Sequence, residues 1–290
     1  MKRLQPLPID DNQVIRELAS NSRLDQTSYP HLQNQLQRVL QAYDNYIQNN
    51  GNPWSVAHPN ITQDLKSGLL SHYSSPPNAV KYLSQLRKSS PDVCPMCGGF
   101  HPTTLDHYLP KTDYPVWSIF SKNLIPACGC NVARGDTVKL TNRPLVRILH
   151  PYFDDFIKYR VLTTEITHDP NFKWIKARVI CTNPNHPNVE SINFHIEQVI
   201  NRNGFSNWQR GKLSKFIERP SSLVPQIPIR REISRGDLIT ALQDCIDHHD
   251  YLCGTPNNWF SMLINGILTT ATLHDWVIGR HNDFVNNRQV

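Results

Sequence analysis

Two closely spaced cysteine pairs constrain this chain more than any other feature of its sequence. Two residues separate Cys94 from Cys97, and one residue separates Cys128 from Cys130. Structural Zn²⁺ takes four Cys or His ligands in a tetrahedron, and two short pairs brought together supply four thiolates. Two glycines directly after the first pair permit a tight turn there. The sequence therefore predicts a structural zinc site that closes the residues between the pairs into a loop.

The alternative to a zinc site is a set of buried or incidental thiols. The N-terminus is basic but lacks the apolar run of a secretory signal, so we expect a cytoplasmic protein. In a reducing compartment its seven cysteines are thiols or metal ligands rather than disulfides. No stretch approaches the roughly 18 apolar residues of a membrane span, so we expect no membrane partner. The one-residue spacing of the second pair leaves open whether Cys130 is a zinc ligand.

Helical periodicity dominates on both sides of this centre. In residues 29–49 the expected buried stripe is Leu32, Leu36, Val39, Leu40, Tyr43 and Ile47. Apolar spacing predicts further helices at 61–73, after Pro76-Pro77, at 190–202, at 207–218 and within 232–281. Residues 159–166 and 172–182 are rich in β-branched and aromatic side chains and flank Asp169-Pro170-Asn171, which predicts a β-hairpin.

These patterns predict an α+β fold, mostly α-helical, around a small metal-rich centre, with an added β-hairpin. Charged residues make up 19% of the chain and hydrophobic residues 39%, so it can bury a core. We expect four regions: an N-terminal helical region at 1–90, the centre at 91–140, a hairpin with basic helices at 141–220, and a C-terminal helical region at 221–290.

The loop between the cysteine pairs combines three chemically useful side chains. Asp106 and His107 are adjacent, and Asn131 directly follows Cys130. A carboxylate and an amide oxygen are ligands for a hard divalent cation such as Mg²⁺ or Mn²⁺. Histidine has a pKa suited to general base catalysis near neutral pH. A base that deprotonates water beside such a cation suits phosphodiester hydrolysis, because the cation stabilises charge on the phosphoryl oxygens.

The same residues resemble the motif of the HNH endonucleases. The similarity lies in CPMCG, LDHYLPK, KNLIPAC and CNVARGD, in this order from Cys94 to Asp136. The family's ββα-metal fold has two strands and a helix around one catalytic metal ion, often with an added Cys₄ zinc site. The resemblance implies that His107 is the general base and that Asp106 and Asn131 hold the catalytic metal.

The resemblance also assigns roles to neighbouring residues. It implies that Asn123 keeps the metal-binding loop in shape and that Arg134 occupies a basic position able to hold a phosphate. We expect Lys111 to contact nucleic acid beside it. The second cysteine pair is one residue shorter than the usual CxxCN of the family, which affects the zinc geometry more than the catalytic metal.

A fainter similarity extends beyond the motif. Residues 148–156, ILHPYFDDF, resemble the segment after the HNH core in nuclease subunits of Septu- and retron-type antiphage systems. Those subunits work beside an ABC-type ATPase. The similarity therefore implies a hetero-complex with such an ATPase, docked through the flanking helices.

Residues 202–231 concentrate the basic charge of the chain. They hold seven Lys and Arg residues against one acid, and the whole chain has a net charge of +6. With Phe205 and Trp208 interleaved, the segment suits phosphate contacts and some base stacking. A solvated helix face is an equally weighted alternative. The nucleic-acid contacts expected here are Arg202, Arg210, Lys212 and Lys215.

Other histidines favour structural or surface roles. Cys245 and His249 share a helix face and, with His248 and Asp250, are a weaker candidate for a second metal site. A solvated histidine pair at a helix end is the favoured interpretation. His150, His168, His186 and His195 have no spacing that indicates a ligand set, so we expect structural or surface positions for them.

Two classes of function remain. The first is a metal-dependent endonuclease with His107, Asp106, Asn123 and Asn131 at its centre, acting on nucleic acid, with DNA the favoured target and RNA the alternative. The second is an inactive, zinc-stabilised module that binds nucleic acid or a partner protein. The adjacent base and metal ligand favour the first, because a module that only binds has no need of them.

Overall fold

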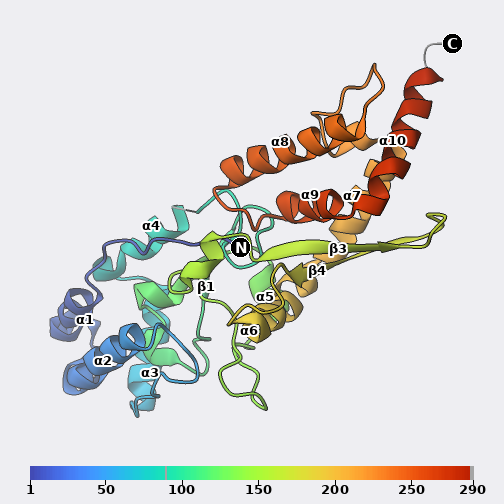
Figure 1. Ribbon diagram of the computed structural model, residues 1–290. Helices are drawn as coiled ribbons and strands as arrows, with labels where there is room; N and C mark the ends of the chain where they lie inside the picture. Colours follow the sequence, from blue (N-terminus) through green and yellow to red (C-terminus); the bar gives the residue numbers. More distant parts are fainter. Residues whose placement is uncertain (89, 288–290) are drawn as a thin grey trace. The chain divides into compact units, whose positions relative to one another are not determined.

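The computed structural model describes residues 1–88 and 90–287 (Figure 1). About half of these residues are helical, and their strands form two small antiparallel sheets. The α+β class is therefore confirmed. The chain divides into two compact units. The N-terminal unit comprises residues 3–96 and 100–155; the C-terminal unit comprises residues 1–2, 97–99 and the described residues from 156 onward.

Helices with one apolar face open the N-terminal unit. They are α1 (Asp11–Ser20), α2 (His31–Gln48), α3 (Gln63–Ser74) and α4 (Tyr82–Lys88), with the 3₁₀ turns η1 (Ser22–Leu24) and η2 (Asn78–Val80). The helices expected at 29–49 and 61–73 are therefore present. The prediction of the buried stripe of α2 is wrong at its last residue. Tyr46 is fully buried, whereas Ile47 is 47% exposed. Both positions continue the helical spacing, but the hydroxyl of Tyr46 has buried polar partners.

Two four-residue strands and a five-residue helix form the middle of the N-terminal unit. β1 (Thr104–His107) pairs antiparallel with β2 (Leu124–Ala127), with His107 opposite Leu124. The connection contains the 3₁₀ turns η3 (Pro115–Trp117) and η4 (Ser121–Asn123), and α5 (Cys130–Arg134) follows β2 closely. Elements this short are not stable alone, so side-chain contacts must hold them in place.

The predicted hairpin is confirmed in the C-terminal unit. β3 (Leu162–His168) and β4 (Ile175–Cys181) pair antiparallel, with Leu162 opposite Cys181. A 3₁₀ turn, η5 (Asp155–Lys158), precedes them. The following helical elements are α6 (Val189–His195), a π-helical turn η6 (Ile196–Ile200), η7 (Asn201–Asn203), α7 (Phe205–Glu218), η8 (Pro220–Ser222), α8 (Arg235–Cys253), α9 (Trp259–Thr269) and α10 (Ala271–Asn286).

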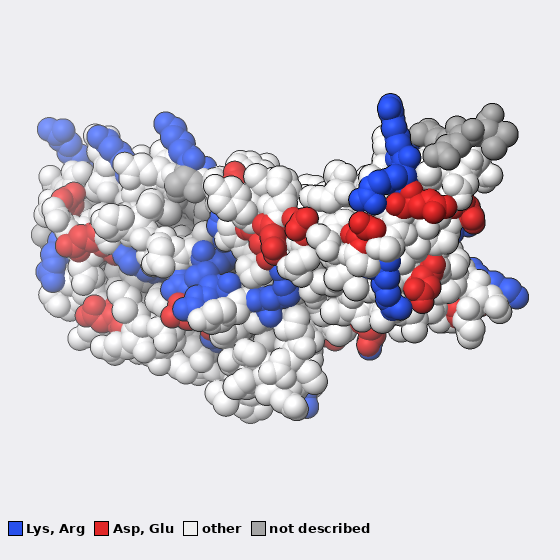
Figure 2. Space-filling view, turned by 45° about the horizontal axis from the view of Figure 1, so that its top comes forward, with Lys and Arg blue, Asp and Glu red and all other residues white. Residues whose placement is uncertain are grey.

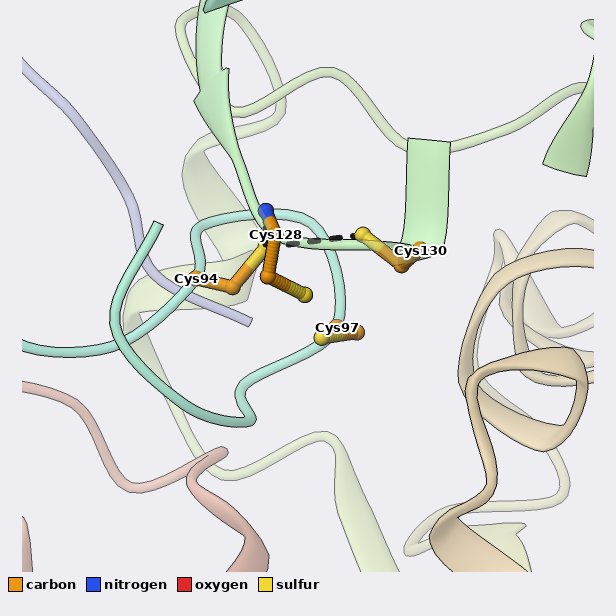
Figure 3. A group of neighbouring side chains, drawn as sticks. All are labelled: Cys94, Cys97, Cys128 and Cys130. Carbon is orange, nitrogen blue, oxygen red and sulfur yellow. Dashed lines mark hydrogen bonds between the residues drawn. The ribbon is translucent and has the colours of Figure 1, made fainter. Parts of the chain in front are cut away.

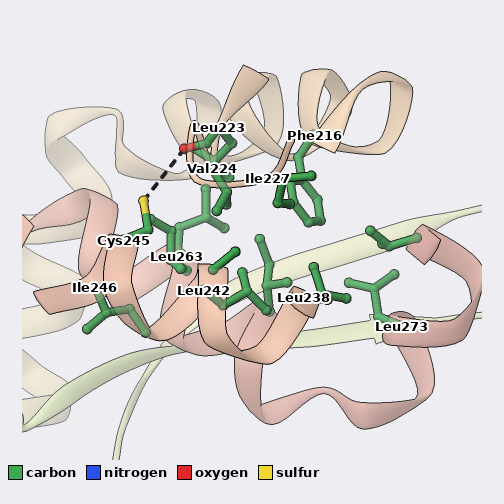
Figure 4. Packing of buried hydrophobic residues seen from close by; sticks show 14 of the residues in the cluster. Phe216, Leu223, Val224, Ile227, Leu238, Leu242, Cys245, Ile246, Leu263 and Leu273 are labelled. Carbon is green, nitrogen blue, oxygen red and sulfur yellow. Dashed lines mark hydrogen bonds between the residues drawn. The ribbon is translucent and has the colours of Figure 1, made fainter. Parts of the chain in front are cut away.

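A continuous apolar cluster holds α7 to α10 together (Figure 4). Leu238 and Leu242 lie one turn apart on α8 and are fully buried against Leu263 of α9 and Leu273 of α10. Ser234 and Asp237 form a reciprocal capping box that starts α8, which satisfies backbone donors at the helix N-terminus. The apolar stripe expected within 232–281 is therefore buried inside this unit.

Among residues 1–88 and 90–287, no helix combines the length and the apolar character needed to cross a membrane. The division into regions 1–90, 91–140, 141–220 and 221–290 stays a prediction.

Candidate metal centre

Four buried cysteines meet beside β2 and α5 (Figure 3). The Sγ atoms of Cys94, Cys97, Cys128 and Cys130 all lie within 4.8 Å of one another. Zn–S bonds of about 2.3 Å in a tetrahedron place sulfur atoms roughly 3.8 Å apart, and Sγ of Cys94 lies 3.5 Å from Sγ of Cys130. The cluster could therefore hold a structural metal such as zinc. Cys130 belongs to it despite the short spacing.

Backbone and side-chain donors point at two of these sulfur atoms. The backbone N–H of Cys128 lies 3.5 Å from Sγ of Cys94. The backbone N–H of Gly99 and the Asn203 amide lie 3.4 and 3.3 Å from Sγ of Cys97. N–H groups stabilise negative charge on sulfur, and such outer partners orient metal ligands. These N–H donors therefore suit cysteines that are deprotonated, as metal-bound cysteines are.

The turn after Cys97 requires glycine. Gly98 has φ of +72°, a conformation that side chains disfavour. A Cβ there would lie 2.1 Å from the backbone oxygen of Asn257. The sequence predicted a tight turn at this point but did not indicate that the backbone of Asn257 approaches it.

Of the expected catalytic residues, Asp106 and His107 lie on β1, Asn131 lies on α5, and Asn123 ends the 3₁₀ turn before β2. Along β1, Thr104 and Asp106 share one face, whereas Leu105 and His107 are buried on the other. Asn131 on α5 donates from Nδ2 to Oγ1 of Thr104 at 3.3 Å. α5 therefore lies over the face of β1 that carries Asp106.

Arg134 ties α5 to β1 from a buried position. Its side chain is 2% exposed, and Nη2 donates to Oδ2 of Asp106 and to the backbone oxygen of His107, both at 2.9 Å. Nη1 donates to the backbone oxygen of Tyr108 at 3.2 Å. The guanidinium therefore hydrogen-bonds to β1 and the residue after it and does not face solvent. The phosphate contact expected from the sequence would need an exposed guanidinium.

Asp106 and Asn131 offer oxygen atoms for a hard cation. The Asp106 side chain is 21% exposed, and its Oδ1 has no hydrogen bond within residues 1–88 and 90–287. Oδ1 of Asn131 is buried and also lacks a hydrogen-bond partner. A buried acceptor without a partner is costly unless a donor or a cation satisfies it. Carboxylate and amide oxygens are the types of ligand that Mg²⁺ takes in proteins.

His107 is held as a neutral base. Its ring is nearly covered and contacts the Tyr73 ring, with ring centres 4.3 Å apart. Nε2 lies 2.8 Å from the backbone oxygen of Ser118, so Nε2 carries the proton and Nδ1 is the basic nitrogen. Burial lowers the pKa of His107 to about 4, and the Ser118 hydrogen bond and Asp106 oppose that shift. The imidazole is therefore neutral at pH 7.

Asn123 clamps the loop between the two strands. The side chain is fully buried, and Oδ1 accepts hydrogen bonds from the Leu109 N–H at 2.8 Å and the Tyr46 hydroxyl at 3.0 Å. Nδ2 donates to the backbone oxygens of Leu109 at 3.0 Å and Trp117 at 3.2 Å. This arrangement suits a residue that shapes the loop rather than one that binds a ligand.

A buried network behind Asn123 includes two residues that the sequence did not single out for the site. The Tyr152 N–H donates to Nδ1 of His150 at 3.1 Å, so Nε2 of His150 carries a proton. That nitrogen lies 3.0 Å from the Tyr46 hydroxyl, which donates onward to Asn123. No sequence signal links these residues, because Tyr46 and His150 are 104 positions apart.

The basic residues expected to bind nucleic acid are in different settings. Lys111 lies 4.6 Å from the centre of the Tyr73 ring, and Lys212 lies 5.2 Å from the Phe260 ring. Arg202, Arg210 and Lys215 are exposed. The face drawn in Figure 2 shows small groups of basic and acidic side chains rather than one basic field.

The second metal site considered at residues 245–253 does not assemble. His249 stacks on Phe260 with ring centres 4.6 Å apart, and Asp250 pairs with Arg160 at 2.6 Å. Within residues 1–88 and 90–287, the four cysteines are the one group of three or more His, Cys, Asp or Glu side chains close enough to hold a metal.

Similarity to known proteins is confined to part of the chain. No family model matches the chain, and no solved structure matches it. Over 121 residues the chain is 29% identical to Protein ea31 of Escherichia phage lambda. The similarity covers 41% of this chain and 35% of the phage protein, so the chain spans about a third of the curated relative that it matches.

Proposed function

We propose that this chain is a metal-dependent endonuclease of the HNH kind, which hydrolyses phosphodiester bonds of nucleic acid, with DNA the favoured target and RNA the alternative. The observation that carries the proposal is the placement of Asp106, His107 and Asn131 on β1 and α5, beside four clustered cysteines. Two antiparallel strands followed by a helix is the element order that the motif implies for a ββα-metal centre.

In the proposed reaction His107 activates the attacking water. Ser118 fixes the tautomer by accepting from Nε2, which leaves Nδ1 to take a proton from water. Because the pKa of His107 is lowered to about 4, the ring is unprotonated across the physiological range. Tyr73 and Asn123 keep the ring and the loop in place.

Asp106 and Asn131 would hold the divalent cation, Mg²⁺ or Mn²⁺. When bound, such an ion stabilises negative charge on the phosphoryl and leaving oxygens. Arg134 orients Asp106 by binding Oδ2, which leaves Oδ1 for the ion. The cysteine cluster would hold Zn²⁺ as a structural metal and so keep α5, with Asn131, against β1.

A second candidate function is an inactive, zinc-stabilised module that binds nucleic acid or a partner. Two observations favour it. His107 is only 5% exposed, and one oxygen of Asp106 is already bound to a buried arginine. Both groups also have ordinary structural roles in these positions.

Cleavage assays separate the two candidates. The purified chain is incubated with plasmid DNA and with total RNA, in Mg²⁺, in Mn²⁺ and in EDTA. We expect metal-dependent cleavage, and His107→Ala should reduce its rate by about 10²- to 10⁴-fold. Asn131→Ala should raise the Mg²⁺ concentration needed for half-maximal rate.

His101 supplies the matched control, because it lies in the same segment and is exposed. His101→Ala should cleave like the unmodified chain. Folding of each variant is checked by circular dichroism and metal content. Cleavage at the normal rate by a folded His107→Ala variant contradicts the assignment of the base.

We also propose an ABC-type ATPase as a partner, on the basis of the fainter similarity at residues 148–156. The apolar face of α8 is buried in its own unit, so deleting α8 to α10 would unfold that unit rather than test docking. Tyr251 and Leu252 near the end of α8 are 86% and 53% exposed and are better test positions. Copurification with an ABC-type ATPase should fall in Tyr251→Asp and Leu252→Asp, and normal copurification argues against docking there.

A further inference from the structure

The C-terminal unit contains a groove that the proposed catalytic centre does not use. Its volume is about 680 Å³, within the range of about 300–1,000 Å³ typical of ligand sites. It is lined by residues 172–177 at the hairpin turn and start of β4, by one face of α7, and by Trp276 and Arg280 of α10. We call it the hairpin groove.

Four basic side chains line the hairpin groove. They are Lys173, Lys176, Arg210 and Arg280, and Glu218 is the one acid among the lining residues. All four basic residues are exposed, and none makes an ion pair with the part of the chain that the structure describes. Their charge is therefore available to an anionic ligand.

Flat aromatic side chains alternate with these cations. Phe172 stacks between His168 and Trp276, with ring centres 4.2 and 4.7 Å away and planes within 18°. Arg280 lies 5.5 Å from the centre of the Trp276 ring. Trp174 is 47% exposed, and Lys176 lies 5.1 Å from its ring centre. Both faces of Phe172 are covered, so Trp174 is the exposed aromatic ring that the groove pairs with positive charge.

The turn that carries Phe172 is held in an unusual conformation. Phe172 has φ of +54°, which is rare for an aromatic residue and persists only where the surroundings impose it. Nε2 of His168 lies 2.8 Å from Oγ1 of Thr272, which fastens the hairpin to the start of α10. The hairpin turn that carries Phe172 is therefore fixed in place before any ligand binds.

A buried amide in the groove lining has an unused acceptor. Gln209 is 1% exposed, and Nε2 donates to the backbone oxygen of Ala177 at 2.6 Å. Its Oε1 has no hydrogen-bond partner. An unsatisfied buried oxygen is costly, so this side chain marks a polar position behind the groove wall.

We propose that the hairpin groove binds single-stranded nucleic acid, with an unpaired base stacked on Trp174 and phosphates on its cations. Stacking on aromatic side chains alternating with basic residues is the means by which proteins bind single strands. A duplex keeps its bases paired and offers no free faces to Trp174. An acidic peptide would satisfy the cations but would leave the exposed ring of Trp174 without a stacking partner.

The groove's role as part of a nuclease's substrate site rests on the proposed function. Its binding of a single strand does not. Binding is therefore measured without cleavage, in EDTA, by fluorescence anisotropy of a labelled single strand of about twelve nucleotides. The same assay is run with the matching duplex and with an acidic peptide of equal charge. We expect the single strand to bind more tightly than either.

Variants connect this binding to the groove. Trp174→Ala should weaken single-strand binding by about 5- to 140-fold, the loss expected for one stacked base. Lys176→Gln should make the salt dependence shallower by about 0.7 in the log–log slope. The matched controls are Tyr159→Ala and Lys158→Gln, an exposed aromatic–lysine pair with 5.1 Å between ammonium and ring centre that does not line the groove.

Each outcome distinguishes this inference from the proposed function. Equal effects of Trp174→Ala and Tyr159→Ala, or equal binding of peptide and single strand, overturn the groove assignment even if His107→Ala abolishes cleavage. Selective loss in Trp174→Ala supports the groove even if the chain cleaves nothing.

Discussion

The centre around β1, β2 and α5 and the core formed by α7 to α10 are held by different kinds of contact. In the centre, the Asn123 side chain alone makes four hydrogen bonds, and the Arg134 guanidinium makes four more. In the core, fully buried leucines such as Leu238 and Leu242 pack against neighbouring helices. Apolar packing is shared among many atoms, whereas a polar tie depends on one donor and one acceptor.

This difference has a consequence for sensitivity to mutation. The centre can use very short elements because specific polar groups and thiols fix them, and so single atoms matter there. The core should lose stability in proportion to the apolar volume removed. The following predictions test this contrast.

The largest effect is expected from breaking the cysteine cluster. Structural zinc contributes about 10–16 kcal/mol in zinc-finger peptides at pH 7, which is comparable to the stability of a whole domain. Cys94→Ser should therefore unfold the centre and remove about one zinc per chain, measured by elemental analysis and thermal denaturation. Cys253→Ser, which changes a half-buried thiol outside the cluster, is the control. Zinc-free, folded protein in the unmodified chain would contradict a structural metal.

A cavity in the core should have a smaller effect that leaves the metal in place. Leu242→Ala should lower the free energy of unfolding by about 2–5 kcal/mol, because the site is fully buried. Ile239→Ala on the same helix removes a side chain that is 41% exposed and should cost less. Urea denaturation with zinc analysis measures both quantities. Loss of zinc in Leu242→Ala would show that the two regions are not independent.

A tyrosine pair on α2 tests the value of one hydroxyl in the centre. Tyr46→Phe removes the hydroxyl between His150 and Asn123 and should cost about 1–3 kcal/mol, since buried polar atoms lose their partner. The hydroxyl of Tyr43, one turn away and also buried, has no hydrogen-bond partner. Tyr43→Phe should therefore be neutral or stabilising in the same denaturation assay. Equal losses would mean that packing, not hydrogen bonding, dominates here too.

The smallest effect is expected from pH. Burial, with help from Arg147 and Arg3, holds the pKa of His150 well below 6.5, so the ring is neutral in the folded state. Below about pH 6.5 the unfolded chain binds a proton at His150 that the folded chain does not. Stability is therefore complete above this pH and falls as pH decreases, by up to about 1.4 kcal/mol per pH unit. His150→Gln should reduce this slope when unfolding is measured as a function of pH.

The sequence was most informative where local patterns decide the structure. The β-branched and aromatic residues on both sides of Asp169-Pro170-Asn171 predicted the hairpin, and two cysteine pairs predicted the cluster. Helical spacing predicted α2, but it could not choose between Tyr46 and Ile47, because only the polar partners of the hydroxyl favour the first.

Contacts between distant positions could not be predicted in this way. Nothing in the sequence indicates that Tyr46 and His150 lie behind Asn123, or that Arg134 is buried against Asp106 rather than exposed. The hairpin groove joins residues from 172 to 280, and its aromatic stack depends on a single unusual φ angle at Phe172. Such features depend on tertiary packing, which periodicity and composition do not encode.

Cys130 and Asn131 are adjacent at the start of α5, so loss of the structural metal should also affect binding of the proposed exchangeable cation. One peptide bond separates a residue of the cysteine cluster from a proposed ligand of the exchangeable cation. A brief treatment with a chelator would strip only the loosely held ion, and adding Mg²⁺ back would restore activity at once. Prolonged chelation that extracts a thiolate-bound metal would release α5 as well, so recovery would then be slow and would require refolding. The two metals should therefore be distinguishable by the kinetics of reactivation alone.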